Sequence, residues 1–332
     1  MTVTAPAARA QAPPAALNAN EPIKATASTI SDLARYESTG LSLLHPYTPG
    51  KIPVVFVHGL WSSPWSWDRM IKALETDDEL NGRYQFWTFG YATGDPIPYS
   101  ASLLRHNLEE ARRRFDPQNS DPAFARMVIV GHSMGGLLSK MMVVDSGDRL
   151  WHMISDRKFE ELSADASDRD IFRQAVIFRP RPEIRRVVFI ATPHQGSHVD
   201  RGSLQRIGTR LVRLPDPLRS VHHRLIARND KEFFKEHFRK GLPTSIDELE
   251  WGSPILKGLH GLNVAATVKA HSIIAVRKGQ QASDATDGLV TYASAHLEGV
   301  ESERVVTAAH LCQDHPEVIH EVRRILVEHE IP

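Results

Sequence analysis

Cysteine is nearly absent from this chain of 332 residues: Cys312 stands alone, so no disulfide can form within the chain and the fold must rest on its hydrophobic core. Charge of one sign is not in excess either, because Lys plus Arg and Asp plus Glu both total 40. This balance gives no reason to expect a nucleic-acid partner. Long hydrophobic runs are missing too, and none approaches the roughly 20 apolar residues that span a bilayer. We therefore expect a soluble chain with no transmembrane segment.

The first residues differ in composition from the rest of the chain. Residues 1–28 are rich in alanine, proline and threonine and show neither a helical nor a strand period, which predicts a disordered leader or linker. They lack the apolar core of a signal peptide, so the compartment stays open: cytoplasmic as given, or secreted or periplasmic if a signal has been removed. Residues 29–332 are expected to form the folded domain.

The most informative stretch reads as strand, sharp turn and helix. A β-branched run at 128–130 leads into Gly131, Ser133 and Gly135 in the pattern G-x-S-x-G, and a helix-length segment follows at 137–144. Glycines on either side of the serine have no Cβ, so the strand and the helix can approach closely. We therefore predict that Ser133 is a nucleophile at the apex of the turn, beside the positive end of a helix dipole.

Strands and helices alternate along the remainder. Strands are expected at 52–57, 84–89, 128–130, 184–191, 270–276 and 303–309, and helices at 101–115, at 137–144 and from 316 onward. Strands without polar positions are typical of parallel sheets that are covered on both faces. The pattern predicts an α/β fold with a mostly parallel, doubly wound sheet.

Three segments together resemble bacterial lipases and related esterases of the α/β-hydrolase superfamily. They are His58-Gly59 after the first long strand, the elbow at 131–136, and Ala-Thr-Pro-His-Gln-Gly-Ser at 191–197. The resemblance implies the α/β-hydrolase fold, with a largely helical cap inserted around the strand that follows the elbow. It also implies an oxyanion hole made by the backbone N–H groups of Leu60 and Met134.

The same resemblance orders the other two catalytic groups after the serine. His310 follows the last expected strand and would be the general base; Asp287, in an Asp-Gly turn, would hold its imidazole. For the acid, Asp284 is a rival and Asp200 a weaker one. The competing histidines are His296, His315 and His320.

Two segments do not fit the alternation and are expected to form the cap. They span about 147–182 and 199–262. Leu204, Ile207, Leu211 and Leu214 share one helical face, with Arg206, Arg210 and Arg213 on the other. Such a basic amphipathic helix fits either a lid that transiently touches a lipid surface or an ordinary cap helix. Phe233, Phe234 and Phe238 allow the same two interpretations.

Aromatic residues near the expected oxyanion hole suggest further contacts. Trp61 could wall an acyl pocket, and His132, beside the nucleophile, is a second candidate substrate contact. Trp65 and Trp67 are expected to pack in the core.

A required metal or cofactor is not expected. His194 and His198 lie four residues apart with Asp200 nearby, but the segment reads as a loop, where this spacing does not place two ligands on one face. Cys312 occupies the position at which some lipases carry a calcium-binding aspartate, two residues after the histidine. No phosphate-binding loop or dinucleotide fingerprint is present.

The sequence thus predicts a serine carboxylic-ester hydrolase acting on a small-molecule or lipid ester with an apolar acyl group. An acyltransferase, a thioesterase or an amidase would use the same three residues. A non-catalytic binding protein on this fold is the alternative from another class.

Overall fold

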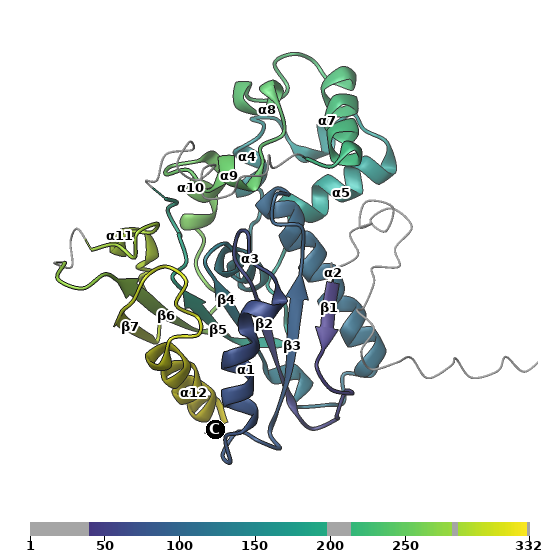
Figure 1. Cartoon of the computed structure of the whole chain (residues 1–332). Coiled ribbons are helices and arrows are strands. Elements are labelled where there is room, and N and C mark those ends of the chain that lie inside the picture. Colours follow the sequence, from purple (N-terminus) through teal and green to yellow (C-terminus); the bar gives the residue numbers. More distant parts are fainter. Residues whose placement is uncertain (1–39, 198–213, 281–284, 331–332) are drawn as a thin grey trace, which may run out of the picture.

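The strands of the described residues form one sheet. The computed structural model describes residues 40–197, 214–280 and 285–330 (Figure 1). Within them, seven strands pair in the order β1-β3-β2-β4-β5-β6-β7. Their bounds are β1 Gly40–Leu43, β2 Ile52–Val57, β3 Tyr84–Gly90, β4 Met127–His132, β5 Ile184–Ile190, β6 Lys269–Val276 and β7 Ser302–Thr307. Only the edge strand β1 runs antiparallel to its neighbour, whereas every other pairing in the sheet is parallel.

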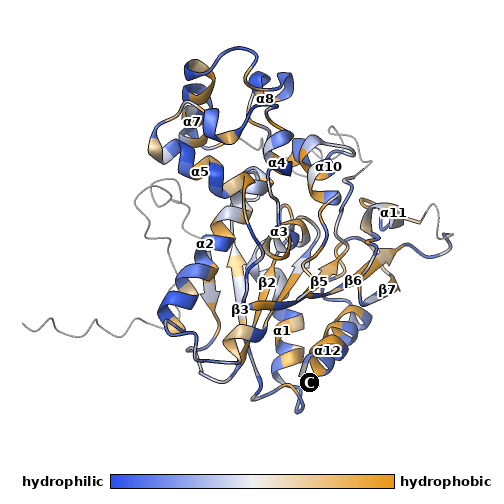
Figure 2. Ribbon diagram, turned by 180° about the vertical axis from the view of Figure 1, so that it is seen from behind, coloured by the Kyte–Doolittle hydropathy of each residue, from blue (hydrophilic) through white to orange (hydrophobic). Residues whose placement is uncertain are grey.

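Helices cover both faces of this sheet, as the unbroken apolar strands predict. Alternate residues of one strand point to opposite faces, and Val55 and Val57 accordingly pack with α2 (Ile97–Phe115) and α3 (Met134–Val143). Val54 and Phe56 pack instead with α1 (Asp68–Glu75) and α12 (Pro316–Glu330). Figure 2 shows hydrophobic strands enclosed by helices with hydrophilic outer surfaces. The predicted α/β fold with its doubly wound, mostly parallel sheet is confirmed.

A group of helices, called the cap below, lies beyond the carboxyl ends of the strands (Figure 1). It consists of α4 (Arg149–His152), α5 (Ala166–Val176), α7 (Asp216–Arg228), α8 (Glu236–Lys240), α9 (Ser245–Glu248) and α10 (Pro254–His260). All six fall within the segments expected to leave the sheet. The leader expected at 1–28 lies outside the described residues. The expected basic helix also lies outside them, apart from its last residue, Leu214.

The cap has an aromatic core of its own. The Trp151 ring meets the rings of Phe159 and Phe233 at centroid distances of 5.0 and 6.2 Å. Phe233, Phe234 and Phe238 are all buried. Of the two interpretations open for these phenylalanines, the structure supports packing inside the cap over contact with a lipid.

The remaining short elements are η1 (Pro64–Trp67), η2 (Phe124–Arg126), η3 (Phe159–Glu161) and α11 (Tyr292–Ala295). The first corrects one expectation: Trp67 is buried, but Trp65 is 78% exposed. A 3₁₀ helix has three residues per turn, so side chains two positions apart point in different directions and only one of the two can face the core. Among the described helices, none is long and apolar enough to cross a membrane.

Candidate active site

Ser133 occupies a strained turn between β4 and α3. Its φ of 53° and ψ of −125° lie in a region that residues with a Cβ rarely adopt. The backbone N–H of Ser133 donates to the carbonyl of Ile190, at the end of the neighbouring strand β5, over 2.8 Å. The turn is therefore fixed to the sheet, and its serine stands at the start of a ten-residue helix.

The glycines of the turn allow the close approach that the sequence predicts. A Cβ at Gly131 would lie 2.5 Å from the carbonyl oxygen of Gly135, and one at Gly135 would lie 2.2 Å from that of Val57. Both distances are far shorter than any contact a carbon atom tolerates, and both involve backbone atoms that cannot rotate away. Any side chain at either position would force β4, α3 and β2 apart.

Ser133, His310 and Asp287 come together although they lie far apart in the sequence. The Nε2 atom of His310 is 2.8 Å from the Ser133 Oγ, and its Nδ1 atom is 2.7 Å from Oδ2 of Asp287. Their relative exposures are 7% for Ser133, 8% for His310 and 1% for Asp287. His310 lies on the loop after β7 and Asp287 on the loop after β6, so all three occupy the carboxyl edge of the sheet.

The surroundings of Asp287 determine how its two oxygens are used. Oδ1 accepts hydrogen bonds from the N–H groups of Leu289, at 2.8 Å, and Val290, at 2.7 Å, which leaves Oδ2 to His310. A carboxylate only accepts, so the His310 proton sits on Nδ1 and its Nε2 atom is free to accept from the serine hydroxyl. This is the geometry that a serine nucleophile with an adjacent base requires.

The rival histidines lie elsewhere, and the two rival acids are not described by the structure. Asp284 and Asp200 are outside the described residues. The ring of His296 bonds to Glu303 over 2.6 Å, and His315 and His320 lie at the start of α12 and within it. Cys312 is buried, and this burial raises the pKa of its thiol to about 12, so the thiol stays protonated and unreactive.

His132 has a different position from the one expected. Its ring is buried, and Nε2 lies 2.8 Å from the backbone carbonyl of His310. Burial lowers the pKa of His132 to about 3, so its ring is neutral; because a carbonyl only accepts, Nε2 carries the proton and donates. This geometry gives no support to the expected substrate contact. The side chain instead connects the elbow to the loop of the candidate base, and nothing in the sequence indicates that pairing across 178 positions.

The candidate oxyanion donors belong to the residue that follows the serine and to the loop after β2. Met134 opens α3, where the first N–H groups have no partner within the helix and the dipole favours an anion. Leu60 follows Gly59, and a Cβ at Gly59 would lie 2.9 Å from that of Ser133, so this loop lies directly against the nucleophile. The loop is held by Tyr91, whose hydroxyl donates to the carbonyl of His58 over 2.7 Å. The role of these two backbone N–H groups as an oxyanion hole stays a prediction.

Two large apolar side chains next to these residues reach solvent. Trp61, which follows Leu60, is 37% exposed and has a φ of 54°, and its N–H donates to the Thr93 hydroxyl over 3.3 Å. Leu311, which follows His310, is 69% exposed. Leu311 was not predicted from the sequence, where an isolated leucine carries no signal. Trp61 as a substrate contact stays a prediction.

The structure gives no support for a metal at His194. Its ring is buried against Phe189, with 4.8 Å between centroids, and burial lowers its pKa well below the usual range. His198, the other candidate ligand, lies outside the described residues. In the part of the chain that the structure describes, no group of three or more His, Cys, Asp or Glu is placed to hold a metal ion.

The chain is similar to a known family in sequence and to solved structures in fold. A sequence model described as "Alpha/beta hydrolase family" matches residues 54–322. No curated protein sequence matches the chain. Among solved structures, the mature form of the Bacillus licheniformis lipase BlEst2 is 15% identical, with 86% of this chain and 97% of that one covered and a TM-score of 0.48.

Two further structures are similar at the same level. A lipase-esterase related protein from Clostridium acetobutylicum is 13% identical, with 86% of this chain and 99% of that one covered and a TM-score of 0.42. The metagenomic carboxyl esterase MGS0156 is 18% identical, with 86% and 77% covered and a TM-score of 0.41. Similarity this distant concerns the fold and carries no argument about substrate.

Proposed function

Because residues 54–322 match its family model, the chain belongs to the α/β-hydrolase family, and we propose that it is a serine carboxylic-ester hydrolase. The observation that carries the proposal is the hydrogen-bonded series from Ser133 through His310 to Asp287, at 2.8 and 2.7 Å. Each group in it has the neighbour that the chemistry needs: a base beside the nucleophile and a buried acceptor behind the base.

The reaction proceeds in two halves. Ser133 Oγ attacks the ester carbonyl while His310 Nε2 takes its proton, and the oxyanion of the tetrahedral intermediate accepts from the N–H groups of Leu60 and Met134. His310 then protonates the leaving alcohol, which departs and leaves an acyl-enzyme on Ser133. Water enters, His310 removes its proton, and collapse of the second intermediate releases the acid and restores the serine.

An apolar acyl group is the proposed preference. The support is the pair of exposed apolar side chains, Trp61 and Leu311, directly next to the candidate oxyanion donor and the base. The residues around Ser133 would act in the same way on an ester, a thioester or an amide. The choice of an ester as the proposed substrate is therefore based on the resemblance of the sequence motifs to those of lipases and esterases.

Hydrolysis of p-nitrophenyl esters from acetate to palmitate tests this proposal. We expect kcat/KM to rise from acetate to longer acyl chains, because each added methylene that is buried contributes about 0.8 kcal/mol of binding. Labelling with a fluorophosphonate should add one phosphonyl group per chain, at Ser133, by peptide mass spectrometry. A protein that hydrolyses none of the esters and resists the label would be a binding protein, and activity confined to acetate would exclude the apolar preference.

The His132 contact predicts a measurable positioning effect. Replacing His132 with leucine removes the donor to the His310 carbonyl, and we expect kcat to fall about tenfold with KM nearly unchanged, which corresponds to a buried hydrogen bond worth about 1.4 kcal/mol. His132→Gln, whose amide N–H reaches a similar point, should recover most of the loss. Rates are to be expressed per active site titrated with the fluorophosphonate.

A purely structural role would give a different result. It would lower the titratable fraction in both variants while leaving kcat per titrated site and its pH profile unchanged. If His132→Leu keeps the wild-type kcat per site, the carbonyl contact does not position the base.

A further inference from the structure

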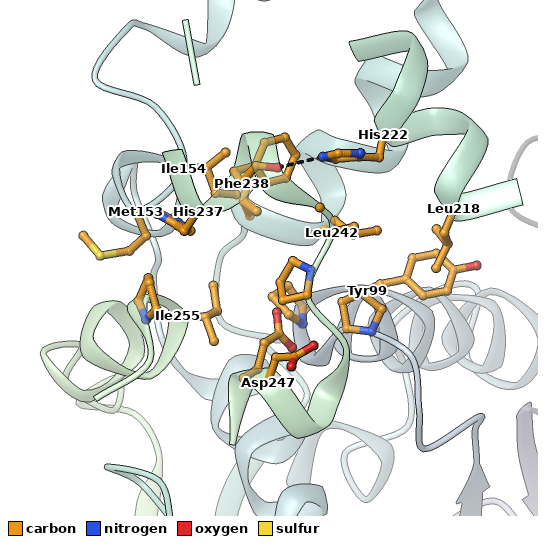
Figure 3. A pocket seen from close by; sticks show the side chains of 18 of the residues that line it. Tyr99, Met153, Ile154, Leu218, His222, His237, Phe238, Leu242, Asp247 and Ile255 are labelled. Carbon is orange, nitrogen blue, oxygen red and sulfur yellow. Dashed lines mark hydrogen bonds between the residues drawn. The ribbon is translucent and has the colours of Figure 1, made fainter. Parts of the chain in front are cut away.

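The cap borders a partly open cavity of about 450 Å³, at the low end of the range typical of small-molecule sites. Residues of five cap helices and of the start of α2 line it; the cap helices are α5, α7, α8, α9 and α10. Ser133, Asp287 and His310 are not among its lining residues. Figure 3 shows Ile154, Leu218, Phe238, Leu242 and Ile255 around it. The walls are thus mostly apolar.

One buried acid lines this apolar space. Glu248, on α9, accepts a hydrogen bond from the N–H of Ile97, the first residue of α2, over 2.5 Å. No hydrogen-bond partner from the described residues is found for its other carboxyl oxygen. Burial raises the pKa of Glu248 to about 8, and nearby Asp247 adds to the rise. The carboxyl group therefore has a backbone donor but lacks a neutralising charge.

The other ionisable side chains around the cavity do not supply that charge. Asp247 is itself acidic and bonds to Thr244. His222, on α7, bonds to the carbonyl of Phe238 over 2.7 Å, and burial lowers the pKa values of both His222 and His237, so both are neutral. Lys240 pairs with Glu236 over 2.8 Å.

We propose that this cavity is a binding site for an aliphatic amine, whose hydrocarbon chain lies against the apolar walls and whose ammonium group pairs with Glu248. The folded protein has already removed this carboxyl from water, so the ligand meets an acid whose desolvation needs no further free energy. Phe172 and Phe238 add aromatic side chains to the apolar walls. The site is independent of ester hydrolysis and goes beyond it.

Isothermal titration calorimetry with three eight-carbon probes tests the inference. At pH 8.5 we expect octylamine to bind at least tenfold more tightly than 1-octanol, and octanoate to bind least, because only the amine supplies a positive charge. Glu248→Gln should remove the preference for the amine over the alcohol. Glu250→Gln removes the same charge from an exposed position two residues away and should leave all three affinities unchanged.

The pH dependence of the affinity adds a second readout. Below the pKa of Glu248 the carboxyl is protonated and must release its proton when it pairs with an ammonium ion, so affinity falls as pH falls. With a pKa of about 8, octylamine should bind roughly 25-fold more weakly at pH 6.5 than at pH 8.5. The affinity for 1-octanol should not change over this range.

Two further variants keep the result interpretable. Ala175→Leu, on the cavity wall, should weaken binding of both the amine and the alcohol even if Glu248→Gln does not fold. Ser133→Ala, or labelling of Ser133, should leave octylamine binding unchanged. The proposal is overturned if wild type does not bind octylamine, if the alcohol binds equally well, if Glu248→Gln retains the preference, or if labelling Ser133 blocks binding.

Discussion

Replacement of Ser133 with alanine is expected to lower kcat on a p-nitrophenyl ester by about 10⁶-fold, the typical cost of removing a serine nucleophile. The variant keeps the Leu60 and Met134 donors and the base, but no acyl-enzyme can form, so the remaining rate comes from water attacking a bound ester. Alanine tolerates the φ of 53° no worse than serine, so the turn and the fold should persist. Far-ultraviolet circular dichroism and the thermal unfolding midpoint check this.

A matched control is available on another helix. Ser102 is also buried, and its hydroxyl donates to the carbonyl of Tyr99, over 2.7 Å on α2. Ser102→Ala should retain kcat within about twofold, as expected for a buried hydroxyl that is not part of the series from Ser133 through His310 to Asp287. More than 1% of wild-type activity in a folded Ser133→Ala variant would disprove the assignment of the nucleophile.

Replacing Asp287 with asparagine should lower kcat by about 10⁴-fold at neutral pH. The N–H groups of Leu289 and Val290 at Oδ1 require an acceptor there, so the asparagine oxygen would occupy that position and its NH₂ group would face His310. Nδ1 would then have to accept, the ring proton would move to Nε2, and that atom could no longer receive the proton of Ser133. Steady-state kinetics near pH 8 measure the loss.

The chain contains a second acid and histidine pair that serves as the control. Glu303 bonds to His296 over 2.6 Å and to the hydroxyl of Tyr292, away from Ser133. Glu303→Gln makes the same isosteric change in charge and should leave kcat within about threefold, the usual range for a partly exposed pair. If Asp287→Asn stays within tenfold of wild type, the acid must be sought elsewhere, with Asp284 the first candidate.

The elbow and the strands that flank it could be predicted from short stretches of the sequence. The strand, both glycines and the serine lie within nine residues. Gly131 and Gly135 make their close contacts with neighbouring strands and helices, and the alternation of strands and helices in the sequence already implies the order of these segments. Asp287 was different: the turn is visible in the sequence, but its preference over Asp284 came only from family resemblance. The roles of these residues in catalysis remain proposals for the experiments above.

The missed features depend on contacts between distant segments. The bond from His132 to the carbonyl of His310 joins residues 178 positions apart, and a carbonyl carries no side-chain signal. Trp65 and Trp67 look equivalent in the sequence, yet a 3₁₀ turn separates them into an exposed and a buried residue. Glu248 gives no hint of burial either, because it lies close to the acidic residues Asp247 and Glu250 and its partner is the distant start of α2.

The described cap helices lie in two insertions, one on each side of β5 in the sequence. The first insertion ends before β5 begins, and the second starts after β5 ends. The nucleophile and its two partners lie on the loops after β4, β6 and β7, outside both insertions. For evolution, this separation means that recombination or drift could exchange whole cap segments without altering Ser133, Asp287 or His310. Descendants of this chain could therefore change what the cap cavity binds while inheriting the same three residues at the edge of the sheet.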